Sequence, residues 1–293
     1  MQNNAVRHWV RLAGALVMAF AFSLRAAQPP ATAPHAEVYQ RAAVQFLDSD
    51  LLKPAEPRNP DLTFKLAPLI VQELSPGNTP TSAPDLFGTA DLSNGVPALD
   101  LSHPAVWYSV DSVPLGGKLH PRLTYLWCYT VEKPLPNAGI LPMQGVRPTL
   151  NSAGQPVIWE ILADPSGAEI LFVSQTLEAA ASAQFGPPLP GRRYSIERAL
   201  DDAPAVVVAR VIEDGPLPMG PIIYLRSGSR SVSTLICRCM PSQGRLVRTA
   251  RNFELRPFPD QTAPIRPATA AFWPGDAATA DRLTRCLRLP EDW

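Results

Sequence analysis

The chain has 293 residues, of which 46% are hydrophobic and 18% charged, so it is long enough and apolar enough to bury a core. Basic and acidic residues balance at 26 each, which leaves no basic footprint of the kind that nucleic-acid binding requires, and no nucleic-acid partner is expected. The 34 prolines are more than twice the ordinary usage of about 5%, and this excess predicts long, stiff connections between strands.

Residues 1–27 have the pattern of a secretory signal peptide. Arg7 and Arg11 lie before an apolar run from Leu12 to Leu24, and small residues follow the run. The run is shorter than the roughly 20 residues of a membrane-spanning helix, so no transmembrane anchor is expected in the mature chain. The alternative is a buried N-terminal helix. The pattern predicts a periplasmic or extracellular protein.

Three segments are expected along the chain. The signal peptide is followed by an N-terminal tether with an amphipathic helix, residues 28–61, in which 37–47 are helical. Residues 62–293 then form a single globular domain that begins with a strand over 62–74. The Ser- and Pro-rich stretch 75–103 is expected to be an irregular loop.

Turn residues divide the centre of the chain into hairpins. Gly154 ends a four-residue turn between two apolar runs, and Pro165 with Gly167 marks the next turn. Ser174 is a candidate N-cap for a short helix that ends at Phe185. Strands are expected at 106–113, 119–131, 146–150, 157–162, 169–173, 194–198, 205–212, 222–225, 232–239 and 246–255.

Short breaks between these strands favour antiparallel pairing, because parallel neighbours need crossovers of a dozen residues or more. A last helix is expected after Asp276. The sequence therefore predicts an α+β fold: a mainly antiparallel sheet with one internal short helix and flanking N- and C-terminal helices.

Four cysteines, Cys128, Cys237, Cys239 and Cys286, predict disulfides in an exported chain. Cys237 and Cys239 would share one face of a strand, with Cα atoms roughly 6.5 Å apart and nearly parallel Cβ vectors. They should therefore not pair with each other, and at least one should reach Cys286 or Cys128. Inert thiols are an alternative.

A thiol-based metal or redox site at Cys237 and Cys239 is the other alternative, because Met219 and Met240 nearby would suit a soft ion. No metal site or cofactor is predicted beyond this. The histidines of the mature chain lack ligand spacing: His35, His103 and His120.

Among the carboxylates, Glu160 shares a strand face with apolar neighbours and needs a partner. Arg210 is the expected partner in a structural ion pair, and Glu197 with Arg198 is a second candidate pair. Alternatively Glu160, paired with Glu197 or Asp214, would be the general acid or base of a hydrolase.

Catalytic sequence motifs are missing: the chain has no Gly-x-Ser-x-Gly, Ser-x-x-Lys, His-Glu-x-x-His or phosphate loop. We therefore expect an exported, non-enzymatic binding or structural module. The hydrolase centred on Glu160 and the thiol-based protein are the two alternatives. The pattern does not indicate a ligand or a partner.

Overall fold

The computed structural model describes residues 36–41, 48–74, 87–91, 98–129, 143–199, 206–238, 247–258 and 282–293. The helices are α1 (Ala36–Arg41), α2 (Leu62–Leu66) and α3 (Gln175–Phe185), and residues 282–286 add a short helical segment. The strands are β1 (Ser49–Pro54), β2 (Leu69–Glu73), β3 (Phe87–Asp91), β4 (Ala98–Asp100), β5 (Ala105–Leu115), β6 (Lys118–Tyr129), β7 (Met143–Leu150), β8 (Pro156–Leu162), β9 (Glu169–Ser174), β10 (Val206–Ile212), β11 (Pro221–Leu225), β12 (Val232–Cys237) and β13 (Val247–Pro257).

These strands form one curved sheet, in the order β10-β9-β8-β7-β6-β5-β13-β1-β2-β11-β12, and β3 with β4 branches from β6. The two end strands, β10 and β12, contact each other. The sheet is therefore a nearly closed, barrel-like structure with an inside and an outside.

The sheet is mixed, so the prediction of a mainly antiparallel α+β fold with flanking helices is wrong. β9 pairs with β10 in parallel, as do β5 with β13, β13 with β1, and β2 with β11. In the chain, α3 separates β9 from β10, so the connection between them is long enough for the crossover that a parallel pair needs. The other three parallel pairs join segments that are far apart in the chain. The short breaks between consecutive strands carry no information about such distant pairings.

The local predictions at the centre of the chain are correct. β7, β8 and β9 form two consecutive antiparallel hairpins, and Gly154 and Gly167 have positive φ values of 76° and 72° in their turns. The Ser174 hydroxyl accepts a hydrogen bond from the Leu177 amide at 3.1 Å, as an N-cap does, and Gly186 follows the end of α3.

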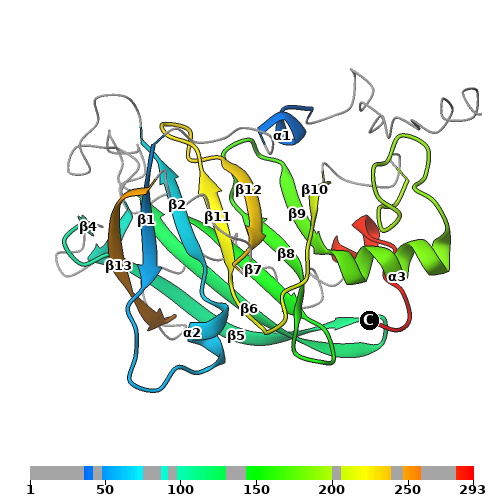
Figure 1. Cartoon of the computed structure of the whole chain (residues 1–293), viewed down its shortest axis with the longest axis horizontal. Helices are drawn as coiled ribbons and strands as arrows, with labels where there is room; N and C mark the ends of the chain where they lie inside the picture. Colours follow the sequence, from blue (N-terminus) through cyan, green and yellow to red (C-terminus); the bar gives the residue numbers. More distant parts are fainter. Residues whose placement is uncertain are drawn as a thin grey trace, which may run out of the picture.

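Side chains from all round the sheet meet inside it. Strand side chains alternate between the two faces, and the inward set forms one apolar cluster that includes Leu52, Ile70, Trp127, Phe172, Val207, Leu235 and Phe253. A second cluster lies outside, where α3 and residues 282–287 cover β8 to β10 (Figure 1). β7 and β8 are consequently buried on both faces, so their polar residues need partners within the protein.

Segments expected to lie outside the sheet belong to it. β1 falls within the range expected as a tether, yet it pairs with both β13 and β2. Residues 62–66 are helical where a strand was expected, because the Asp61 carboxylate accepts a hydrogen bond from the Phe64 amide as an N-cap. Residues 194–198 form a turn with a single bridge from Glu197 to Leu287, and two short strands occur within 75–103.

The expected signal peptide, residues 1–27, lies outside the described residues. So do the remainder of the expected N-terminal helix beyond Arg41 and the expected N-cap Asp276. Among the helices that are described, none has the length and apolar character needed to cross a membrane.

Candidate functional site

A cavity of about 240 Å³ lies where the end of β6 and the start of β7 meet two turns, the β8–β9 turn and the β11–β12 turn. Its lining residues are Tyr129, Met143, Gln144, Ala163, Pro165, Gly228, Ser229 and Arg230. One group of these residues comes from β6, β7 and the β8–β9 turn, and the other comes from the turn between the last two strands of the order, β11 and β12. They meet only because the sheet curls round on itself, and we call this cavity the mouth cavity.

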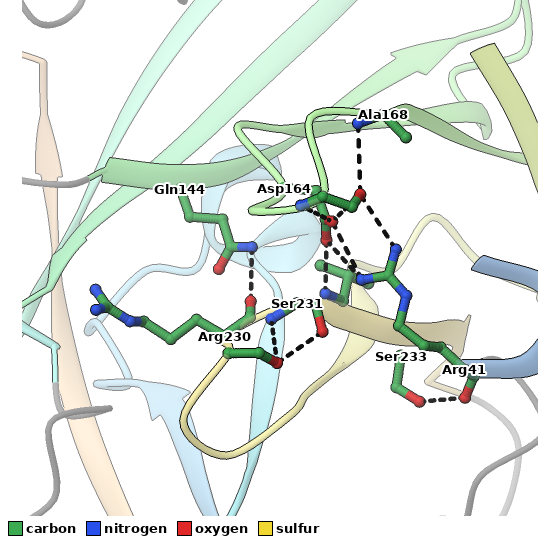
Figure 2. Close-up of polar contacts among 10 residues, drawn as sticks. Arg41, Gln144, Asp164, Ala168, Arg230, Ser231 and Ser233 are labelled. Atoms are coloured by element: carbon green, nitrogen blue, oxygen red, sulfur yellow. Dashed lines mark hydrogen bonds and ion pairs between the residues drawn. The ribbon is translucent and has the colours of Figure 1, made fainter. Parts of the chain in front are cut away.

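Asp164 joins the two turns. Its carboxylate accepts hydrogen bonds from the Val232 amide at 2.8 Å and from the Ser166 amide at 3.0 Å (Figure 2). The Arg41 guanidinium donates to the same carboxylate at 3.1 Å, and the Asp164 side chain has no exposed surface. A buried carboxylate that is fully engaged in this way fixes the spacing of the turns that line the cavity.

Helix α1 lies over the seam between β10 and β12, and it supplies Arg41. Val38 is buried in the inner apolar cluster, and the Ser233 hydroxyl on β12 donates to the Arg41 carbonyl at 2.5 Å. Arg193 lies over the Tyr39 ring with its Cζ 4.5 Å from the ring centroid. The seam is therefore closed by side chains from α1, although β10 and β12 are not paired as a ladder.

A chain of hydrogen bonds orders the floor of the mouth cavity. Trp127 Nε1 donates to the Tyr129 hydroxyl at 2.8 Å, and that hydroxyl donates to Gln144 Oε1 at 2.9 Å. Gln144 Nε2 donates to the Arg230 carbonyl at 2.9 Å (Figure 2). Both amide atoms of Gln144 are thus engaged, which links β6 and β7 to the β11–β12 turn.

Two lining residues have backbone angles that favour glycine. Ala163 has φ of 55° and Arg230 has φ of 58°. A residue with a side chain in this region costs roughly 1–2 kcal/mol more than in an ordinary conformation. Such residues persist only where the surrounding contacts hold them, and they concentrate at functional sites.

The Arg230 guanidinium is the charged group of the mouth cavity. Its Cζ lies 4.9 Å from the centroid of the Tyr129 ring, and Figure 2 shows it directed away from Asp164 and Arg41. Nearby carboxylates are already paired: Asp164 with Arg41, and Glu73 with Arg226 at 3.0 Å. Within the described residues no carboxylate pairs with Arg230, so the cavity carries an excess positive charge.

Glu160 lies outside the mouth cavity, on the outer face of β8. Arg147, directly opposite on β7, binds it through two hydrogen bonds of 2.8 Å, and Arg282 forms a second ion pair with it. The predicted partner, Arg210, is exposed on β10. Burial raises the pKa of Glu160, but the positive charges of Arg147 and Arg282 lower it by more. The net pKa is therefore below its ordinary value.

That environment does not suit a general acid, which needs a raised pKa and access to substrate. Glu160 is 2% exposed, and the cavity beside it, about 20 Å³, has room for one water molecule. Its lining includes Glu169, Arg282 and Cys286 but neither Glu197 nor Asp214.

The other two candidate carboxylates serve local structure. Glu197 accepts from the Arg193 and Tyr194 amides at 2.9 and 2.8 Å, lies 3.7 Å from Arg192, and has its pKa raised by burial. Its expected partner Arg198 instead donates to the Thr284 carbonyl. The exposed Asp214 accepts from the Thr176 amide at the start of α3. The structure does not bring these carboxylates together with Glu160.

The predicted disulfides to Cys128 or Cys286 are wrong, because both of these thiols are free. They are buried in separate apolar clusters, Cys128 with Leu126, Met143 and Leu162, and Cys286 with Leu283 and residues of α3. Burial raises the pKa of Cys128 to about 12 and that of Cys286 to about 11, so both are protonated thiols at neutral pH. Cys237, half-buried at the end of β12, is disulfide-bonded, but not to either of these two free thiols. Cys239 lies outside the described residues.

Asp100, Ser102 and His103 form an exposed polar cluster that sequence reasoning did not identify. Ser102 Oγ lies 3.0 Å from His103 Nδ1, and Asp100 Oδ2 lies 2.8 Å from the same nitrogen. A catalytic triad uses the two ring nitrogens separately, one for the serine and one for the carboxylate, so this cluster is not a triad. No group of three or more metal-ligating side chains occurs within the described residues.

No protein-family model matches the sequence, and comparisons with curated proteins and with solved structures find no match. The structure itself defines the class: a nearly closed, mixed β-sheet protein with an ordered, positively charged cavity at one end. A functional assignment has to come from that geometry.

Proposed function

We propose that this chain is a non-enzymatic binding module and that the mouth cavity is its ligand site. The observation that carries the proposal is the cavity of about 240 Å³, whose polar lining is held in place before any ligand arrives. Gln144 and Asp164 fix the strands and turns around it through the hydrogen bonds described above. A concave, preformed site with a few convergent polar groups is the usual form of a small-molecule site.

Size limits the ligand. A dry cavity of about 150 Å³ holds benzene, and sites for drug-sized ligands begin at about 300 Å³. The mouth cavity falls between these values, so its ligand should have one ring, or a chain of similar volume, and a polar group.

A fragment screen by NMR tests the proposal. A mixture of neutral, cationic and anionic fragments, each with one ring, is titrated into the wild-type chain and into Ser229→Trp, which fills the cavity from its exposed rim. Ser112→Trp, on the exposed face of β5, adds the same bulk away from the cavity. We expect saturable binding in the wild type and in Ser112→Trp, with loss in Ser229→Trp. Fragments that bind equally to all three proteins would contradict the proposal.

A further inference from the structure

We infer that the ligand of the mouth cavity is a small organic carboxylate, which pairs with Arg230 and places its apolar part against Ala163 and Pro165. The inference rests on the proposed binding function and specifies the chemical class of its ligand. Charge is the first reason. Asp164 and Glu73 are each neutralised by their own arginine, which leaves the Arg230 charge without a counterion within the described residues.

The orientation of Arg230 is the second reason. Its Cζ lies over the Tyr129 ring, 4.9 Å from the ring centroid, and a guanidinium held on an aromatic face can still donate from the N–H groups that point away from the ring. That edge matches a planar carboxylate, which it can bind through two parallel hydrogen bonds. The Ser229 hydroxyl, which accepts from the Ser231 amide at 3.3 Å and contacts the Ser231 hydroxyl at 2.9 Å, lies in the same lining.

The number of cationic groups selects among anions. Among the described residues that line the cavity, Arg230 is the only arginine or lysine. A single guanidinium balances one negative charge, as in a carboxylate, whereas a phosphate group carries nearly two and normally meets several cationic or backbone donors. Ala163 and Pro165 then supply an apolar wall that an inorganic ion would not use. The lining therefore fits a carboxylate attached to an apolar group.

The backbone of Arg230 is the third reason. Glycine would adopt φ of 58° without strain, so an arginine at this position costs stability. The Arg230 carbonyl accepts a hydrogen bond from Gln144, but a residue of any type at this position would supply the same carbonyl. The guanidinium is the feature that the strained backbone places over Tyr129.

Calorimetric titration with benzoate and benzamide tests the inference, because the two probes share a ring and differ in charge. We expect benzoate to bind at least about tenfold more tightly than benzamide, as one charge-assisted pair is worth a factor of this size or more. Arg230→Gly should lose that preference while remaining folded, since glycine suits the backbone, and Arg230→Lys should keep part of it. Arg210→Ala removes an exposed arginine from β10 and should change the affinity by less than about twofold.

Inorganic phosphate is the third probe, and it should bind more weakly than benzoate. Phosphate binding tighter than benzoate, or equal affinities for benzoate and benzamide in the wild type, would overturn the carboxylate assignment while leaving the mouth cavity as a ligand site. If none of the three probes binds and the fragment screen also finds nothing, the binding function itself fails.

Discussion

Arg147→Met should lower the free energy of unfolding by about 3–5 kcal/mol, the usual cost of removing one partner from a buried ion pair. Arg147 and Glu160 are each 2% exposed and are joined by two hydrogen bonds across β7 and β8. Without Arg147 the carboxylate would keep only Arg282, which is partly exposed and also pairs with Glu169. Denaturant unfolding followed by tryptophan fluorescence measures the change.

The matched control is the double variant Arg147→Met with Glu160→Met, which removes both charges and keeps apolar volume. Its stability should return to within about 1.5 kcal/mol of the wild type, because a buried pair replaced by apolar groups is often close to neutral. A single variant that loses less than about 1 kcal/mol would contradict the burial of this pair.

The same pair gives stability a pH dependence. The pKa of Glu160 in the folded chain is below its ordinary value of 4.5, so its contribution is fully present above that pH and is lost as pH falls through the folded pKa. The wild type should therefore lose more stability than the double variant between about pH 5 and pH 3. Equal losses in the two proteins would be inconsistent with the pairing.

Asp164→Ala should destabilise the chain by about 3 kcal/mol and weaken benzoate binding as well. The substitution removes the acceptor of the buried Val232 amide. It also removes the counterion of Arg41, whose side chain is only 15% exposed. An unsatisfied buried donor alone costs roughly 1–3 kcal/mol, and bonds to a charged group are worth roughly 1.5–3 kcal/mol.

Asp164→Asn is the control for charge, since the amide keeps one acceptor oxygen with nearly the same shape. It should lose about half as much stability as the alanine variant, because hydrogen bonds to neutral groups are weaker. Thermal unfolding and calorimetric titration on the same samples would report both effects. An alanine variant that binds benzoate as tightly as the wild type would show that Asp164 does not position the cavity.

Local signals in the sequence were sufficient for the central part of the sheet. Gly154 and Gly167 marked turns that the structure confirms, and Ser174 caps α3 as expected. The requirement that Glu160 have a partner was also sound, although Arg210 was the wrong residue. The hairpin register places Arg147 opposite Glu160, so counting outward from the Gly154 turn would have found the pair.

The closure of the sheet had no local signal. β1 pairs with β13, about 200 residues later in the chain, and β11 pairs in parallel with β2. Such pairings are set by the fit of whole apolar faces inside the sheet, and no turn residue encodes them. The mouth cavity was missed for the same reason: Tyr129, Gln144 and Arg230 have no sequence pattern in common and meet only when the sheet closes.

Cysteine spacing was the weakest guide. An even number of cysteines predicted a disulfide to Cys128 or Cys286, but each of these thiols lies in its own apolar cluster outside the inner core. Free cysteine is often simply a small buried apolar residue, and that is how these two residues behave.

The most direct test of the binding site is NMR of the chain labelled at its alanine methyl groups during titration with benzoate. Ala163 lines the mouth cavity, whereas Ala181 of α3 lies in the outer apolar cluster and is not among the lining residues. We expect a saturable shift of the Ala163 methyl signal, with a nuclear Overhauser contact to the benzoate ring, and an unchanged Ala181 signal. An Ala163 signal that does not respond to saturating benzoate, or a ring contact at Ala181 instead, would contradict the assignment of the mouth cavity as the ligand site.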